Sequence, residues 1–139
     1  PFRAKNFFTK KIINGAIAIK DGKQKFLEVG NLQIKRDFGY AKNYVEAMWK
    51  LLQQEKPKDI IICSGESIML RDVVEYVFKK LEIDKSLIIE KKEFYRPNEI
   101  FDIYGDNSEA KKTLNWDYNL SFFKVLDILI DYEINNRAR

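Results

Sequence analysis

The side chains best placed to do chemistry in this 139-residue chain are basic residues at predicted turns and at the starts of predicted helices. Arg36 lies in a turn flanked by glycines, and Arg96 precedes Pro97 with Glu99 three residues further on. Arginine in a constrained turn suits bidentate contact with a phosphate or a base edge, and a carboxylate can accept hydrogen bonds from ribose hydroxyls. These residues predict a surface that binds an anionic ligand.

Three further basic residues, Arg3, Lys10 and Lys11, lie before or within the first turns of a predicted helix. A lysine there acts toward an anion as a point charge, without the fixed geometry of arginine. For each of these cations the alternative is an ordinary charge on a solvated face, and the sequence leaves both interpretations open. Aromatic and proline neighbours favour the binding interpretation for Arg36 and Arg96.

The sequence lacks the residues that most catalytic and metal sites use. It contains no histidine, which removes the commonest general base and metal ligand, and it has neither a GxGxxG nor a GxxxxGK phosphate loop. Cys63 lies in the most apolar segment, so we interpret it as a core thiol. Tyr76 and Lys80 match a Tyr-x-x-x-Lys proton-donor spacing, but such pairs arise by chance on an amphipathic helix. We therefore predict no catalytic residue and no metal site in this chain.

Hydrophobic periodicity predicts the elements that must position these residues. Strands alternate with helices, so the expected fold class is α/β. Apolar residues at helical spacing predict helices over 7–20, 40–54, 69–81 and 108–114 and from Ser121 onward. Short apolar runs predict strands over 25–29, 34–38, 60–63 and 87–89, with the first two paired across the turn at 30–31. The run at 60–63 shows no polar alternation, which suits a strand covered on both faces.

The composition is that of one domain with a hydrophobic core, because 45% of the residues are apolar. Net charge is +4, but charged residues make up 33% of the chain and both signs are interspersed, so we do not expect a nucleic-acid partner. We expect no membrane span and no signal peptide, which makes the cytoplasm the expected location. The chain begins at Pro1 rather than Met, which suggests a segment of a longer protein.

Several motifs follow one another in a specific order. They are Pro-Phe-Arg and Asn-Phe-Phe-Thr-Lys-Lys-Ile near the start, Gly-Asn-Leu, then Lys-Arg-Asp-Phe-Gly-Tyr-Ala-Lys-Asn-Tyr-Val-Glu-Ala-Met-Trp, Ser-Gly-Glu, Tyr-Arg-Pro-Asn-Glu and Leu-Asn-Trp. With these motifs, from Pro1 to about Asp131, the chain resembles the GDP-mannose 4,6-dehydratases, which are extended short-chain dehydrogenase/reductases. The block at 35–49 is the most specific part of the resemblance.

The resemblance implies that residues 1–139 are the C-terminal, substrate-binding part of such an enzyme. It implies a small lobe plus a strand, at 60–63, that would join the sheet of an N-terminal Rossmann half outside this chain. That half would bind NADP and carry the catalytic residues. The implied enzyme is an NADP-dependent lyase and homo-oligomer of GDP-fucose biosynthesis that converts a GDP-sugar to its 4-keto-6-deoxy derivative.

The resemblance also implies roles for individual residues of this chain. By resemblance, Arg3 contacts the NADP phosphates. Lys11 and Arg36 match positions that hold the diphosphate of the GDP-sugar, and Arg96 and Glu99 match positions that clamp its nucleoside.

The chain departs from the family pattern at several motif positions. Phe2 stands in place of arginine, Phe38 of tryptophan, Tyr40 of histidine, Asn43 of aspartate and Ile68 of histidine. These changes keep the charged positions but leave the sugar open, with GDP-mannose, another GDP-hexose or a GDP-heptose as candidates. Two other functions stay open as well: the equivalent part of another sugar-nucleotide epimerase or reductase, and a binding fragment without catalysis.

Overall fold

The computed structural model describes residues 4–137, and these form short strands and helices in alternation. Arg3 lies outside the described residues, so its expected contact with the cofactor stays a prediction. In chain order the elements are α1 (Phe8–Lys20), β1 (Leu27–Val29), β2 (Lys35–Asp37), α2 (Ala41–Leu52), β3 (Ser67–Met69), α3 (Leu70–Lys80), η1 (Lys85–Leu87), β4 (Ile88–Glu90), η2 (Lys92–Phe94), β5 (Asp102–Ile103), α4 (Ser108–Leu114) and α5 (Phe122–Arg137). The predicted α/β class is confirmed.

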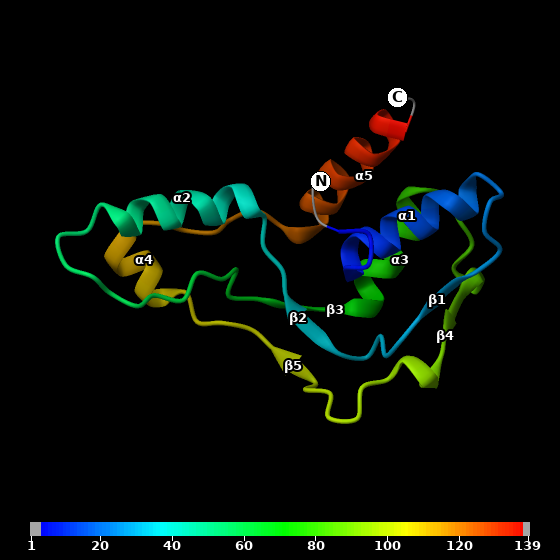
Figure 1. The fold of residues 1–139 in the computed structure, drawn as a ribbon, viewed down its shortest axis with the longest axis horizontal. Helices are drawn as coiled ribbons and strands as arrows, with labels where there is room; N and C mark the ends of the chain where they lie inside the picture. Colours follow the sequence, from blue (N-terminus) through cyan, green and yellow to red (C-terminus); the bar gives the residue numbers. More distant parts are fainter. Residues whose placement is uncertain (1–3, 138–139) are drawn as a thin grey trace.

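The helices gather at two ends of an elongated molecule (Figure 1). One end holds α1, α3 and α5 beside the pair β1 and β4, and the other end holds α2 and α4. The strands β2, β3 and β5 lie between the two ends, so this small sheet is where the two groups of helices meet. Within residues 4–137, no helix combines the length and apolarity that crossing a bilayer requires.

The larger core forms where α1, α3 and α5 pack together beside β1. Each helix buries apolar residues at helical spacing, as its sequence predicts. A Cβ on Gly15 would lie 2.6 Å from Leu27 Cδ1, so glycine at this position lets α1 approach β1 closely. The buried helix residues of this core are Ile12, Ile13, Ala16, Ile17, Leu70, Val73, Val74, Val77, Phe78, Phe122, Val125, Leu126 and Ile130.

The Tyr76–Lys80 pair links α3 to α5. Tyr76 Oη donates to Asp127 Oδ1 at 2.9 Å, and Lys80 Nζ lies 3.1 Å from the same oxygen. Both side chains are therefore engaged by one carboxylate of a neighbouring helix, in agreement with the interpretation that their catalytic-type spacing is a coincidence.

A second, smaller core joins α2 to α4. It contains Ala47, Ala110, Leu114, Trp116 and Tyr118. Its aromatic rings meet edge to face with Tyr44 of α2, at centroid distances of 6.0 Å to Trp116 and 5.6 Å to Tyr118. Such pairs stabilise beyond the area they bury, so this end of the molecule has a core of its own.

The sheet pairing differs from the prediction. β1 runs parallel to β4, whereas β2 pairs antiparallel with β3 and parallel with β5. The predicted hairpin between 25–29 and 34–38 is therefore wrong. Leu32 and Ile34, in the connection between β1 and β2, are 1% and 6% exposed. Because these side chains enter the main core, the connection cannot fold back as a short turn.

Within residues 4–137 the segment 60–63 forms no ladder and lies as irregular chain. The expectation that it pairs with a sheet outside this chain stays a prediction. Ile60 and Ile62 pack against the α2–α4 core, whereas Ile61 is 63% exposed. The apolar run thus buries alternate side chains without strand pairing.

Candidate functional site

Arg36 is held at the centre of the three-stranded sheet. Its strand β2 lies between β3 and β5, with Arg36 opposite Ile68 on one side and Ile103 on the other. Arg36 Nη1 donates to the Ile100 carbonyl at 2.8 Å and to the Lys35 carbonyl at 2.6 Å. The backbone around the guanidinium is therefore fixed on both sides, and the side chain itself is oriented by carbonyl oxygens.

Arg36 also forms an ion pair with Glu99, another predicted site residue. Arg36 Nη2 donates to Glu99 Oε1 at 2.5 Å, and the two side chains are only 23% and 18% exposed. The structure thus brings together two residues that the family resemblance assigned to different parts of the ligand. Guanidinium has five N–H donors, and these contacts do not use all of them. The predicted contact of Glu99 with a nucleoside is not tested.

Asp37 anchors the loops beside β2, a role that the sequence analysis missed. Its Oδ1 accepts from Ser64 N at 3.0 Å and from Ser64 Oγ at 2.6 Å, and its Oδ2 accepts from Gly65 N at 3.0 Å. Gly65 has φ +86°, a conformation that favours glycine. The available signals were an acidic residue next to the arginine and a Ser-Gly turn, but nothing in the sequence pairs them.

The Asp37 carboxylate also affects two weak acids, the half-buried Tyr44 and the buried Cys63. Burial, and next the nearby Asp37 charge, raise the pKa of Tyr44 above its usual range. The same two causes, in the same order, raise the pKa of Cys63. Cys63 is 7% exposed, so its thiol lies in the core, as predicted.

Phe38, the aromatic residue of the arginine turn, packs into the main core. Its ring stacks on Phe122 at a centroid distance of 4.4 Å and an interplanar angle of 10°, and on Phe8 at 6.2 Å. Phe38 therefore holds the turn against α1 and α5. An aromatic residue next to this strand therefore helps to fix Arg36 in place, because its ring packs against two other rings.

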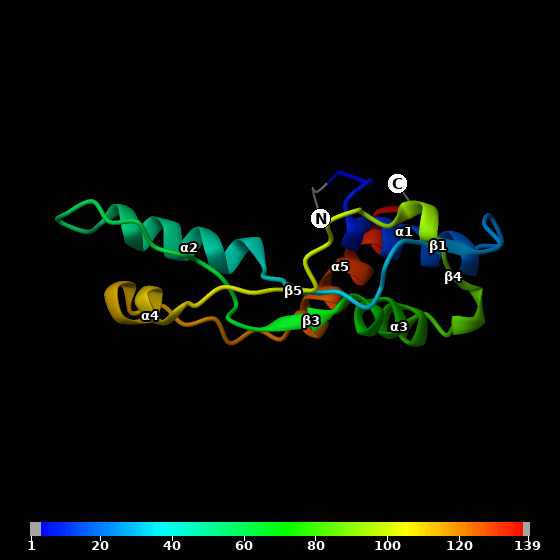
Figure 2. The same cartoon turned by 90° about the horizontal axis from the view of Figure 1, so that it is seen from below.

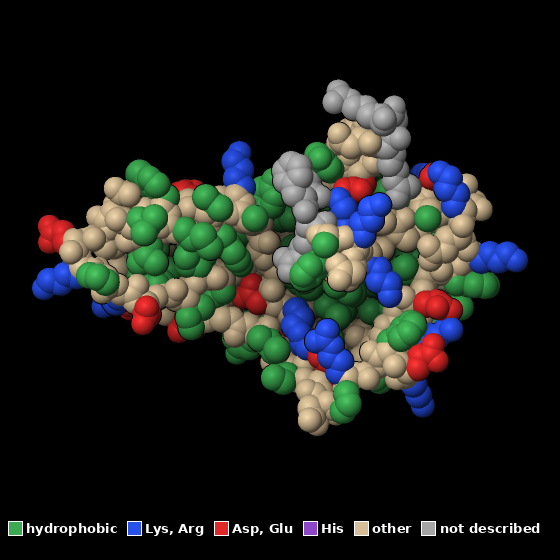
Figure 3. Space-filling view, viewed as in Figure 1, with side chains coloured by type: hydrophobic (Ala, Val, Ile, Leu, Met, Phe, Trp, Pro, Cys, Tyr) green, Lys and Arg blue, Asp and Glu red, His purple; other side chains and the backbone are tan. Residues whose placement is uncertain are grey.

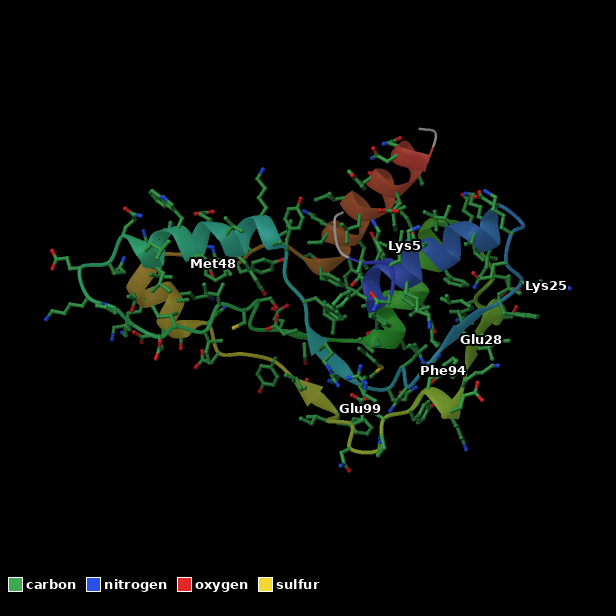
Figure 4. The ribbon with its side chains drawn as sticks, in the orientation of Figure 1. Lys5, Lys25, Glu28, Met48, Phe94 and Glu99 are labelled. Carbon is green, nitrogen blue, oxygen red and sulfur yellow. The ribbon has the colours of Figure 1, made fainter. Side chains whose placement is uncertain are left out.

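Lys11 lies at a cleft of about 630 Å³ between α1, β1 and η2. Its Nζ is 5.5 Å from the centre of the Phe94 ring. The lining also includes Lys5, Lys25, Phe26 and Glu28, and Figure 4 shows Lys5 near the start of α1 with Lys25 and Glu28 toward the far end. Lys5 and Lys25 were not among the predicted site residues. Three lysines beside two aromatic rings suit an anion that carries a flat group.

Lys10 does not face this cleft. Its ammonium group forms an ion pair with Glu133 of α5 and lies 5.9 Å from the centre of the Tyr132 ring. Of the two lysines in the first turns of α1, Lys11 alone lines the cleft, and Lys10 links α1 to α5.

Arg96 lies in the exposed segment between η2 and β5. The segment follows Phe94, the last residue of η2, which faces Lys11, and it carries Glu99, which pairs with Arg36. It is held on β4 by Tyr95 Oη, which donates to Glu90 Oε2 at 3.4 Å, while Arg71 forms an ion pair with Glu90. Within residues 4–137 Arg96 itself forms no ion pair. This segment therefore connects the Lys11 cleft to the Arg36–Glu99 pair and presents Arg96 between them.

The fold is found in solved structures of other proteins. The structure of RMD from Pseudomonas aeruginosa complexed with NADPH superposes with a TM-score of 0.84 at 20% identity, covering 94% of this chain and 43% of that one. dTDP-glucose 4,6-dehydratase from Bacillus anthracis in complex with NAD gives 0.83 at 14% identity, covering 98% and 41%. The fold is thus the C-terminal portion of the fold of the extended short-chain dehydrogenase/reductases.

The chain belongs to the GDP-mannose 4,6 dehydratase family, whose family model matches residues 1–129. It is 37% identical over 140 residues to GDP-mannose 4,6 dehydratase 1 of Arabidopsis thaliana, covering 100% of this chain and 39% of that protein. It is 34% identical over 154 residues to human GDP-mannose 4,6 dehydratase, covering 96% and 41%. The chain therefore spans about two fifths of the length of these relatives and matches their C-terminal part.

Proposed function

We propose that residues 1–139 are the substrate-binding, C-terminal segment of a GDP-sugar 4,6-dehydratase, an NADP-dependent lyase. The main support for this proposal is the 37% sequence identity, along the whole chain, to the Arabidopsis thaliana protein named GDP-mannose 4,6 dehydratase 1. The oriented Arg36 and the lysine-lined cleft support the same proposal, because a nucleotide sugar carries a diphosphate and a flat base. The enzyme would convert the GDP-sugar to its 4-keto-6-deoxy derivative by losing one water.

In this proposal the chain binds and orients the substrate. Arg36, held by Glu99, and Lys11 contact the diphosphate, and Arg96 with Glu99 lies against the nucleoside. Charge-assisted hydrogen bonds of this kind are about twice as strong as neutral ones. Fixing the sugar relative to groups elsewhere in the enzyme is a recognised source of rate acceleration.

NADP would be bound by an N-terminal Rossmann half of the same protein, with Arg3 of this chain against its phosphates. The sequence of this chain has no glycine-rich phosphate loop, so that loop would be supplied by the N-terminal half. The choice of NADP over NAD is supported by the NADPH bound in the Pseudomonas aeruginosa RMD structure, which has the same fold. We also propose a cytoplasmic homo-oligomer that acts in GDP-fucose biosynthesis.

The test is to incubate the full-length protein with NADP and a panel of GDP- and UDP-sugars and to measure the products by mass. Loss of one water from a GDP-sugar alone is the expected result. An unchanged mass with inversion at one sugar carbon would instead indicate an epimerase, the activity named for a structural neighbour at TM-score 0.77. No turnover, together with tight binding of a GDP-sugar, would indicate a binding protein.

A further inference from the structure

Glu90, the last residue of β4, binds donors from three different parts of the chain. Its Oε2 accepts from Leu32 N at 3.3 Å and from Tyr95 Oη at 3.4 Å, and its Oε1 forms an ion pair with Arg71 of α3. The Glu90 side chain is 25% exposed. One carboxylate thus joins the β1–β2 connection, α3 and the chain that follows η2.

Two of these partners, Leu32 and Arg71, are fixed by the main core. The Leu32 side chain is buried there, and its carbonyl oxygen accepts from Arg71 N at 3.1 Å. The next bond along is donated by Leu70 N to the Ile34 carbonyl at 2.9 Å. Backbone that is hydrogen-bonded and carries buried side chains opens rarely. Glu90 therefore has a fixed position, and a flexible group that it binds takes its position from the core.

The third partner, Tyr95, begins the irregular chain of residues 95–101, which we call the Arg96 segment. All of its residues except Glu99 are exposed, so burial does not fix its path. Figure 2 shows the segment crossing from η2, beside α1 and β1, to β5. Tyr95 is bonded to Glu90, and Glu99 is bonded to β2. Two contacts thus flank Arg96, one residue before it and three residues after it.

The chain just before the Arg96 segment lies close against the β1–β2 connection. A Cβ on Gly30 would lie 3.0 Å from the Phe94 carbonyl oxygen, and Lys91 N donates to the Val29 carbonyl at 2.8 Å. The segment therefore leaves from a fixed point, and the Tyr95 hydroxyl restrains its direction. The space-filling view shows Lys and Arg side chains gathered on this face, between the β2–β5 pair and α1 (Figure 3). The direction of the segment matters because it decides whether Arg96 reaches an anion bound on that face.

We propose that Glu90 is a positioning residue that holds Tyr95 and thereby orients Arg96 for the nucleoside of the substrate. The inference rests on the proposed function, in which Arg96 contacts that nucleoside. Glu90 does not touch the substrate and acts through the Tyr95 hydroxyl. An exposed segment that becomes ordered only on binding costs conformational entropy, which lowers affinity. By restraining the segment in the free protein, Glu90 removes part of that cost.

A double-mutant cycle on the full-length protein, with GDP as the probe, tests the inference. Tyr95→Phe removes the hydroxyl and keeps the ring, and Arg96→Ala removes the group that is positioned. In calorimetric titrations we expect Tyr95→Phe to raise the Kd for GDP about fivefold when Arg96 is present. In the Arg96→Ala background the same change should shift the Kd by less than about twofold, because the hydroxyl acts through Arg96. Equal shifts in the two backgrounds, or no shift when Arg96 is present, would overturn the inference.

Two controls match the chemistry of these changes. Tyr104→Phe removes the hydroxyl of an exposed tyrosine and should leave the Kd within about twofold. Glu90→Ala should raise the Kd at least as much as Tyr95→Phe, whereas Glu75→Ala, which removes a second carboxylate 4.0 Å from Arg71, should have little effect. Equal effects of the two glutamate variants would mean that charge near Arg71 matters and not the hold on Tyr95, which would also overturn the inference. Wild-type protein that binds no GDP would overturn the proposed function, and this inference with it.

Discussion

Arg36 donates to Glu99 Oε1 at 2.5 Å across 63 residues of sequence. The contact means that the arginine of the glycine-flanked turn is oriented before any ligand is present. Glu99 belongs to the same exposed segment as Arg96, so the position of that segment and the position of Arg36 depend on each other. One ion pair thus couples the two ends of the proposed substrate site.

Replacing Glu99 by alanine should weaken both the fold and the site. Arg36 would keep a largely shielded charge without its carboxylate partner, and an unsatisfied buried group of this kind costs about 1–3 kcal/mol. Urea unfolding measures the change, and the matched control is Glu93→Ala, whose side chain is 65% exposed. Exposed substitutions usually stay within about 0.5 kcal/mol. Equal stability of the two variants would show that the pair does not hold Arg36.

Replacing Arg96 by alanine should impair substrate binding more than cofactor binding. Loss of one charge-assisted hydrogen bond of about 1.5–3 kcal/mol corresponds to a rise in KM for the GDP-sugar of roughly tenfold or more. NADP affinity, measured by fluorescence titration of the full-length protein, should stay within about twofold. Lys92→Ala, which removes an exposed cation four residues earlier, is the control for general charge loss. Equal losses for substrate and cofactor would contradict the assigned role.

Asp37→Asn should destabilise the sheet although the side chain keeps its size. Ser64 N, Ser64 Oγ and Gly65 N all donate to the carboxylate, and an amide would set its own N–H₂ donor against at least one of them. We expect a loss of about 2 kcal/mol in the free energy of unfolding. Asp59→Asn, at an exposed position, should leave stability nearly unchanged. A similar small effect at Asp37 would mean that the loops beside β2 are held by other contacts.

Cys63 should resist alkylation in the native protein. Burial, and next the Asp37 charge, raise the pKa of its thiol, and only the thiolate reacts with iodoacetamide. A raised pKa lowers the thiolate fraction near pH 8, so labelling should be at least about tenfold slower than in urea-unfolded protein. The native rate should keep increasing at pH values where an ordinary thiol is already ionised. Mass spectrometry of the peptide that contains Cys63 gives both rates, and equal rates would contradict the shielded thiol.

The helices could be predicted closely from the sequence, whereas the strand partners could not. α4 begins and ends at the predicted residues, and α1 begins one residue later than predicted. Helical hydrogen bonds connect residues four apart, so the pattern that specifies a helix lies within it. The pairing of β1 with β4 joins Leu27 to Ile88, and the burial of Leu32 and Ile34 that excludes the hairpin depends on the whole core.

The candidate site divides in the same way. The sequence by itself determined the residue types at the turns, the absence of histidine and of a phosphate loop, and the family, because motifs in a fixed order carry that information. Only the tertiary structure decided that Glu99 holds Arg36, that Asp37 anchors the 64–65 turn and that Lys10 faces α5. It also decided that one apolar side of α2 is left uncovered by the rest of residues 4–137. Each of these is a contact, or a missing contact, between segments far apart in sequence, and such proximity arises only when the chain closes into its fold.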